Sequence, residues 1–201
     1  GDPRASGDTV AALLEKGYAD RMRGAIHADR AMERVPPAAS GGGDTVYLAV
    51  ADRDGGAVSF INSLYYAFGS GIVSEKTGVM LHNRGTLFTL AEGHPNRIAP
   101  RKRPMHTLMP GMLAKDGEAV MPFGVMGGHY QPFGHVQLVV NMLDYGLDVQ
   151  EAIDLPRFFH MGNALVVERG VPRATAEALA KMGHRVYAAG APVGGGQAIW
   201  S

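Results

Sequence analysis

The sequence changes abruptly at Thr45 from a polar, glycine-rich tether to an apolar run. Gly41–Gly43 and Asp44 precede the threonine, and Tyr47–Ala51 predicts a buried β-strand. A chain that cut itself before Thr45 would bring a hydroxyl and a free α-amine together at the end of a rigid strand, and that amine can serve as the base the hydroxyl needs. The alternative is a glycine-rich loop that enters a strand through an ordinary β-forming threonine. On this stretch alone, the alternative is favoured.

The composition bounds the class of protein. The 201 residues fit one ordinary domain, and 46% hydrophobic residues suffice for a core. The net charge of +0 argues against a nucleic-acid-binding surface or a polybasic membrane patch. No apolar run approaches the ~18 residues of a transmembrane helix, so we expect no membrane span. The absence of cysteine excludes disulfides, cysteine nucleophiles and thiolate metal sites.

The N-terminal part is predicted to be helical. Asp8 is a suitable N-cap for a helix reaching about Arg30, since Val10, Leu13 and Leu14 fall on one face. The proline- and glycine-rich stretch 35–43 predicts a linker to a β-rich remainder. The chain starts without Met and without an apolar leader, so we expect it to be a fragment.

The remainder predicts an α+β layered fold, with strand pairs first, helices next and strands again. Glycine-bearing turns are expected at 68–73 and 126–129, a loop at 92–103, and hairpin turns at Asp52–Gly56 and Asp116-Gly117. Helices are expected at 133–145, 149–153 and 173–182. Strands are expected at 47–51, 57–62, 79–83, 108–115, 119–124, 164–168, 185–188 and from 194 to 200, where the chain stops.

Three features in this order resemble the small, catalytic subunit of γ-glutamyltranspeptidases, and within that family the γ-glutamyltranspeptidase-like acylases. They are Thr45 at the strand start, the stretch 58–73, and the stretch 102–110 followed by 124–128. The resemblance runs from Thr45 to the C-terminus. It implies two parts, 1–44 as the end of the large subunit and 45–201 as a small subunit that stops short of its C-terminus.

The resemblance implies an N-terminal-nucleophile hydrolase with an αββα sandwich, of which the large-subunit part is missing here. It implies a precursor that cuts itself at Asp44–Thr45 into two subunits that stay together. The expected partners are a small-molecule amide or peptide substrate and the large subunit, and two processed heterodimers can associate. No cofactor is expected.

The same resemblance assigns roles to four residues. Thr45 would attack an amide carbonyl to form an acyl-enzyme. Ser63 falls where the family has a threonine whose hydroxyl hydrogen-bonds the nucleophile. Backbone N–H groups of Gly127 and Gly128 would form the oxyanion hole, and glycine allows the unusual backbone angles that such a turn needs.

The substrate-binding positions depart from the family pattern. Tyr65 replaces an asparagine, Arg84 a glutamine, and His106-Thr107 a serine pair that binds the α-carboxylate. Leu87 replaces the acidic residue that pairs with the α-ammonium group, so a γ-glutamyl ammonium would stay unpaired at a cost of several kcal/mol. Arg84, His106 and Thr107 can instead hold an anionic acyl group such as glutaryl, or Tyr65 can pack on a more apolar acyl chain.

Two alternatives remain open: a cephalosporin or glutaryl-amide acylase on the same machinery, and an unprocessed, inactive fragment that acts as a binding module. No metal is expected, because the histidine spacings match no standard zinc pattern. We interpret these histidines as turn and surface residues, with only His106 near the substrate. They are His82, His106, His129, His135 and His160.

Overall fold

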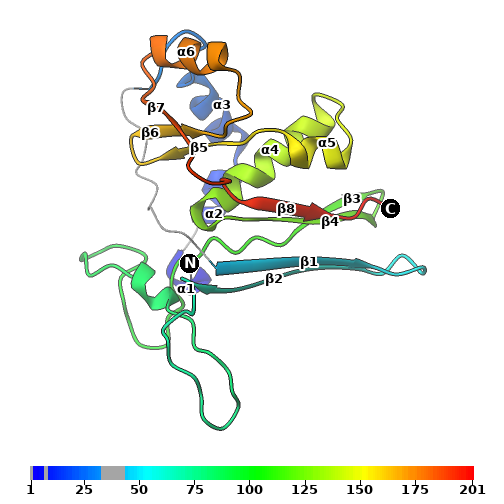
Figure 1. Cartoon of the computed structure of the whole chain (residues 1–201). Coiled ribbons are helices and arrows are strands. Elements are labelled where there is room, and N and C mark those ends of the chain that lie inside the picture. The colour runs from blue at the N-terminus through cyan, green and yellow to red at the C-terminus, as the bar shows by residue number, and fades with distance from the viewer. Residues whose placement is uncertain (1, 7–8, 33–43) are drawn as a thin grey trace.

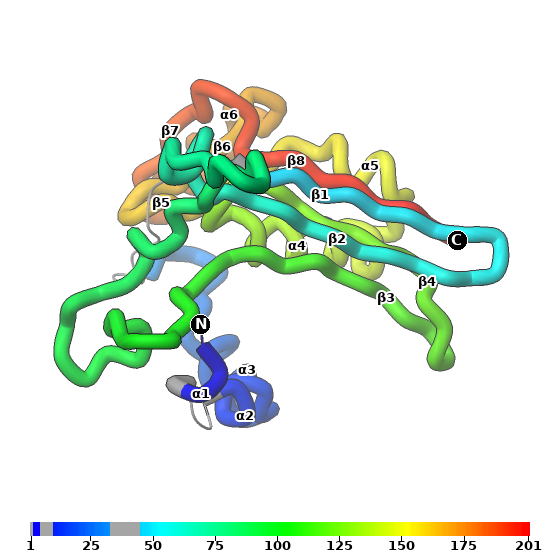
Figure 2. Tube along the Cα trace, turned by 90° about the horizontal axis from the view of Figure 1, so that it is seen from below, coloured from blue at the N-terminus to red at the C-terminus, as the bar shows by residue number. Residues whose placement is uncertain are grey.

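The computed structural model describes residues 2–6, 9–32 and 44–201, and two stacked β-sheets lie at its centre (Figures 1 and 2). The first sheet is an antiparallel hairpin of β1 (Asp44–Ala51) and β2 (Ala57–Tyr65). The second sheet has the order β3-β4-β8, and its middle strand faces β1 and β2. Its strands are β3 (Gly111–Lys115), β4 (Glu118–Met126) and β8 (Gly195–Ala198).

Helices cover the other face of the second sheet (Figure 1). They are α4 (Gln131–Leu143) and α5 (Val149–Asp154). A capping box between Asp148 and Glu151 starts α5. The core between helices and sheet is built on the buried residues Met121, Phe123, Leu138 and Ala152. The described chain therefore stacks one helix layer on two sheet layers.

A third sheet, of order β5-β6-β7, packs at one end of these layers. Helix α6 (Arg173–Lys181) connects β6 to β7, which are parallel. Val125, Tyr130 and Phe159 form a second buried cluster that joins this sheet to the end of β4. The strands are β5 (Phe158–Met161), β6 (Ala164–Val167) and β7 (Val186–Ala188).

The single long helix predicted up to Arg30 is wrong. The chain instead forms α1 (Pro3–Ser6), α2 (Thr9–Leu14) and α3 (Lys16–Gly24), with an extended backbone at Glu15. Val10, Leu13 and Leu14, which should have packed, are exposed within the described part of the chain, so burial gives a longer helix little support. The predicted N-cap at position 8 and the linker 35–43 lie outside the described residues.

Hydrogen bonds near residues 2–4 and at Ala31 attach this N-terminal part to the rest of the molecule. The buried Asp2 carboxylate accepts hydrogen bonds from Arg4 Nη2 at 2.7 Å and from the backbone N–H of Arg103 at 3.1 Å. At the other end, the Ala31 N–H donates to the Met182 carbonyl at 2.7 Å. The segment before the linker is therefore attached at both of its ends.

The predicted hairpins are confirmed, whereas one predicted strand is wrong and one observed strand was not predicted. The Asp52 N–H donates to the Gly56 carbonyl, and Asp116 and Gly117 both have positive φ. The strand predicted at 79–83 is absent from the described chain, where only a single bridge joins Val73 to Met80. Strand β5 was not predicted.

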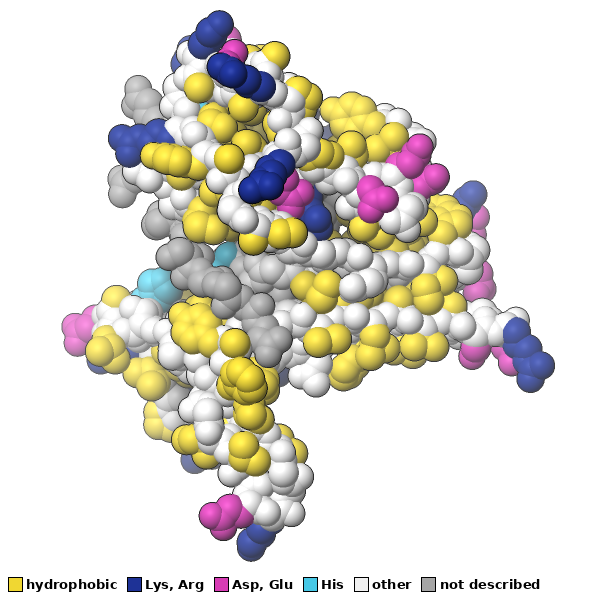
Figure 3. Space-filling view, viewed as in Figure 1, with side chains coloured by type: hydrophobic (Ala, Val, Ile, Leu, Met, Phe, Trp, Pro, Cys, Tyr) yellow, Lys and Arg dark blue, Asp and Glu magenta, His cyan; other side chains and the backbone are white. Residues whose placement is uncertain are grey.

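The outer face of the β1–β2 hairpin is apolar and exposed. Alternation along the strands turns Val46, Leu48 and Val50 away from β4, and 44–59% of each of these side chains is exposed. Val58 and Phe60 extend the same face, along which Figure 3 shows a row of hydrophobic side chains. The second helix layer of an αββα sandwich does not lie within the described residues. None of the helices described combines the length and apolarity that a membrane crossing requires.

Candidate active site

Thr45 and Ser63 are direct partners across the β1–β2 hairpin. The Thr45 Oγ1 hydroxyl donates to Ser63 Oγ at 3.0 Å, and both residues are half-buried. Because side chains two apart lie on one face of a strand, Thr45 lies on the same face as Tyr47, the face toward β4. The sequence-predicted nucleophile and its supporting hydroxyl are thus adjacent.

The bond predicted to be cut lies at an irregularity of this ladder. Asp44 pairs with Tyr65 and Thr45 pairs with Ser63, so the register shifts between Asp44 and Thr45 and leaves Leu64 as an extra residue. The Leu64 carbonyl accepts from the Asn83 N–H at 3.2 Å, which fixes the irregularity. Such bulges are over-represented beside active sites because they redirect side chains.

Arg84 places a buried positive charge beside this pair. It begins the short 3-10 helix η1 (Arg84–Leu87), and its Nη2 donates to Ser63 Oγ at 2.7 Å. Its guanidinium carbon lies 5.0 Å from the centre of the Tyr65 ring, within the range of a cation–π contact. Its Nη1 is buried and has no hydrogen-bond partner within the described part of the chain. This nitrogen is available to a ligand.

Tyr65 completes the group around Ser63. Its N–H donates to Ser63 Oγ at 3.0 Å, and its side chain is buried. Its φ of 78° is unusual for a bulky aromatic residue, and such outliers persist only where neighbouring contacts enforce them. Stacking on Tyr66 and the Arg84 guanidinium supply those contacts.

Contacts between the two sheets fix which end of β4 meets Thr45. The Tyr47 ring lies directly against Gly124, and Ser59 Oγ donates to the Phe123 carbonyl at 3.3 Å. Ser59 pairs with Ala49, so Ala49 lies near Phe123, whereas Tyr47 lies against Gly124. The part of β1 nearer Thr45 therefore faces the part of β4 nearer its C-terminal end. The C-terminal end of β4 lies at the same end of the stacked sheets as the start of β1 (Figure 1).

The Gly127-Gly128 turn follows at that end and starts the 3-10 helix η2 (Gly128–Tyr130). Gly127 has φ 126° and Gly128 has φ 58°, angles that residues with a side chain rarely adopt. The Tyr130 N–H closes the turn by donating to the Gly127 carbonyl at 3.0 Å. The φ of Gly127 therefore requires glycine, and at Gly128 glycine is the residue that adopts the observed φ with the least strain.

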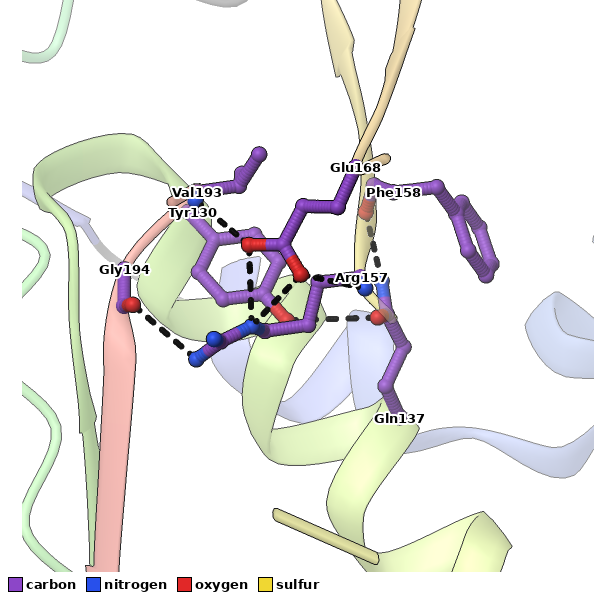
Figure 4. A network of polar contacts seen from close by, with 7 residues as sticks. All are labelled: Tyr130, Gln137, Arg157, Phe158, Glu168, Val193 and Gly194. Atoms are coloured by element: carbon purple, nitrogen blue, oxygen red, sulfur yellow. Dashed lines mark hydrogen bonds and ion pairs between the residues drawn. The ribbon is translucent and has the colours of Figure 1, made fainter. Parts of the chain in front are cut away.

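An ion pair braces the segment behind this turn (Figure 4). The Glu168 carboxylate accepts from Arg157 Nε at 3.2 Å and from the Val193 N–H at 2.7 Å, while Arg157 Nη1 donates to the Gly194 carbonyl at 2.9 Å. Gly194 Cα lies 3.2 Å from where a Cβ on Gly127 would be. Sequence reasoning missed this brace because its members are distant along the chain.

Electrostatics place two histidines near Arg84. Burial, assisted by the Arg84 charge, lowers the pKa of His106 and likewise that of His129. His129 Nε2 is buried and has no hydrogen-bond partner within the residues described. Thr107, beside His106, is also buried. Of the predicted substrate-binding positions, Tyr65 contacts Arg84 directly, and His106 responds to the Arg84 charge.

One histidine prediction is wrong. His135 is buried in α4 rather than on the surface, with Nδ1 2.7 Å from the Gln131 carbonyl oxygen and its ring against Phe123. The helical spacing on which the prediction of α4 rested does not distinguish a buried histidine from an exposed one.

Comparison with known proteins agrees with this geometry. A family model described as Gamma-glutamyltranspeptidase matches residues 1–201. The structure superposes on a cephalosporin acylase from Bacillus halodurans with a TM-score of 0.89 and 41% identity, over 99% of this chain and 37% of that one. It superposes on a γ-glutamyltranspeptidase from Pseudomonas nitroreducens with a TM-score of 0.70 and 26% identity, over 77% of this chain and 88% of that one.

Curated relatives point the same way. The glutathione hydrolase-like YwrD proenzyme of Bacillus subtilis is 43% identical over 159 residues, 78% of this chain and 29% of that protein. The oxamate amidohydrolase proenzyme of Klebsiella pneumoniae is 38% identical over 152 residues, which are 73% of this chain and 29% of that protein. The acylase ACY 1 proenzyme of Pseudomonas sp. (strain SE83) is 32% identical over 191 residues, which are 94% of this chain and 34% of that protein.

Stacked sheets with a threonine at the start of the first strand define part of an N-terminal-nucleophile hydrolase fold, as predicted. The chain belongs to the γ-glutamyltranspeptidase family. It spans about a third of the length of these curated relatives, between 29% and 34%.

Proposed function

We propose that this chain carries the catalytic centre of an amidohydrolase and acyltransferase that cuts itself at Asp44–Thr45. The observation that carries the proposal is the 3.0 Å hydrogen bond between the hydroxyls of Thr45 and Ser63, directly beside the register shift at the bond to be cut. Cutting that bond converts the Thr45 nitrogen into a free amine on the residue whose hydroxyl Ser63 already holds.

In the proposed reaction, Thr45 Oγ bonds to the carbonyl carbon of an amide while the Thr45 amine takes its proton. The N–H groups of Gly127 and Gly128 stabilise the oxyanion, and collapse expels the leaving amine, which receives the proton. Water or an acceptor amine then takes the acyl group from Thr45 Oγ. Gly127 also lines a cleft of about 660 Å³.

We further propose that the acyl group is anionic. Arg84 Nη1 is buried without a partner, and His106 lies near it, so a carboxylate would gain hydrogen bonds there. Leu87 stands where a γ-glutamyl ammonium would need an acidic partner. The names of the relatives include both an amidohydrolase of the carboxylate oxamate and acylases, which is consistent with a different acyl group on the same machinery.

The remaining layer of the sandwich is proposed to come from the large subunit of the same precursor. The exposed apolar face of β1 and β2 is the surface that a second helix layer would cover. Residues 1–44 are then the end of that subunit, and 45–201 belong to the small one.

Intact-mass measurement tests the proposed function. We expect two pieces separated before Thr45, and hydrolysis of glutaryl anilide at least as fast as that of γ-glutamyl anilide. Thr45→Ala should give one uncut chain without turnover. A wild-type chain that stays uncut on long incubation would favour a binding module instead, and clear preference for the γ-glutamyl anilide would contradict the anionic acyl site.

A further inference from the structure

Three donors converge on the single oxygen of Ser63. Thr45 Oγ1 lies at 3.0 Å, the Tyr65 N–H nitrogen at 3.0 Å and Arg84 Nη2 at 2.7 Å. A hydroxyl oxygen has two lone pairs, so the three donors cannot all be satisfied together. The hydrogen bond from the charged Arg84 is the shortest of the three, and the backbone fixes the Tyr65 donor. The hydrogen bond from Thr45 to Ser63 is therefore the weakest of the three. Its proton is therefore the one most easily given to another acceptor.

The local structure holds Arg84 rigidly in this position. The preceding residue, Asn83, makes two hydrogen bonds with the end of β2. Its N–H donates to the Leu64 carbonyl, and its Oδ1 accepts from the Tyr66 N–H at 3.1 Å. The Tyr65 ring then covers the guanidinium. Burial lowers the pKa of Arg84, yet an arginine keeps its charge in proteins. A permanent positive charge therefore lies two hydrogen bonds from the Thr45 hydroxyl.

Resting on the proposed function, we infer that Arg84 sets the proton affinity of the catalytic base, the α-amine that cleavage exposes on Thr45. A nearby positive charge disfavours the ammonium form, so the amine stays neutral and able to accept the Thr45 hydroxyl proton. The same charge stabilises the oxygen anion that forms as this proton leaves. Arg84 thus acts on Thr45 as a positioning and electrostatic group, through Nη2, while Nη1 remains for the acyl group.

Tyr65, His106 and His129 do not cancel the effect. Tyr65 from β2 carries no charge near neutral pH, because burial raises its pKa. His106, and His129 from η2, are also kept neutral, because burial lowers the pKa of each. The opposing charges are the two carboxylates of Asp44, its side chain and the α-carboxylate that cleavage leaves, and the cut removes their covalent link to Thr45.

The test measures the Thr45 amine directly. The rate at which cyanate carbamoylates this amine is followed against pH, by mass of the N-terminal peptide of the processed small subunit. In wild type we expect a midpoint below the usual α-amine range of about 7.7–8.0. Arg84→Gln should raise the midpoint by about one pH unit, since a charge two hydrogen bonds from the Thr45 hydroxyl contributes on that order. Arg84→Lys should largely restore the wild-type midpoint.

A neutral acyl substrate separates this role from carboxylate binding. With butyryl anilide, the acid limb of kcat/KM should move to higher pH in Arg84→Gln, and it should stay in place in Arg53→Gln, which removes the same charge at the far hairpin turn. A wild-type midpoint of about 8 in a processed, active enzyme would overturn this inference and leave the proposed function standing. An unchanged midpoint in processed Arg84→Gln would also overturn it. An uncut wild-type chain would overturn both.

Discussion

The ring of Tyr47 lies against the backbone of Gly124, at the contact between the two sheets. A Cβ on Gly124 would overlap the ring, so the sheets approach this closely only because residue 124 has no side chain. The Tyr47 hydroxyl is also held, 2.8 Å from Ser59 Oγ. Since Thr45 is two residues from Tyr47, this contact sets the position of Thr45 relative to the end of β4.

Gly124→Ala should therefore displace β1 and reduce both stability and processing. We expect a loss of about 1–3 kcal/mol in the free energy of unfolding, as for other overpacked core sites. Chemical denaturation and the fraction cut before Thr45 are the measurements. Gly24→Ala is the matched control, because a Cβ there meets nothing within 4 Å. Equal behaviour of the two variants would contradict the proposed role of the sheet contact.

Ser63→Ala should slow turnover by about tenfold to a hundredfold, the effect of losing about 1.4 to 2.7 kcal/mol of support at the nucleophile. The kinetics should be measured on processed protein, with the extent of cleavage quantified separately. Ser59→Ala serves as control, because it lies on the same face of β2 but bonds Tyr47 and the Phe123 carbonyl instead. It should lower stability while retaining turnover, and slow turnover in both variants would argue for a general packing effect.

Gly127→Ala should reduce turnover by on the order of 100-fold, the usual effect of losing an oxyanion donor. With φ at 126° and Gly194 Cα 3.2 Å from the new Cβ, the turn must move to accept alanine. Because the proposed N–H donors act on the transition state, kcat should fall much more than KM rises. A variant that raised only KM would assign the turn to substrate binding.

Glu168→Gln should destabilise the protein in a pH-dependent way. Burial by itself raises the pKa of the Glu168 carboxyl. Hydrogen bonds from the backbone N–H groups of Arg157 and Val193, together with the Arg157 charge, outweigh this effect. The pKa of Glu168 therefore lies below its ordinary value of 4.5. A folded-state pKa below the unfolded one gives stabilisation that is present above the unfolded value and lost as pH falls through the folded value. At pH 7 the variant should lose about 1–2 kcal/mol.

The measurement is thermal unfolding of wild type and Glu168→Gln between pH 7 and 3. The gap in Tm should close as the pH falls below 4.5. Exposed Glu177, which pairs with Arg173 at one turn's spacing on α6, provides the control substitution. Glu177→Gln should change Tm little at any pH. A gap for Glu168→Gln that stayed constant down to pH 3 would contradict the ion-pair account.

Local patterns predicted those parts of the fold whose cause is local. The Asp116-Gly117 turn and the helical spacing of α4 each gave an element close to its observed bounds. Thr45 and Ser63 lie just beyond the predicted ends of two strands joined by a short turn, so their adjacency follows when the hairpin register is continued past those ends. The helix expected to reach Arg30 failed because its apolar face has no packing partner among the described residues.

Long-range contacts account for what the sequence did not predict. The positive φ of Tyr65 accompanies the contact of its ring with the Arg84 guanidinium, which comes from a segment distant along the chain. The bonds of Glu168 to Arg157 and Val193 join segments that only the tertiary fold brings together. The unpaired Nη1 of Arg84 likewise becomes visible only when its surroundings are known.

The attachment of the N-terminal part at Asp2 and at Ala31 has a consequence for the fate of the severed chain. Both attachment points lie upstream of the bond before Thr45, and both bind to residues downstream of it, at Arg103 and Met182. Self-cleavage would therefore create two new chain ends without releasing either piece. Dissociation would require breaking non-covalent contacts that the cut itself leaves intact.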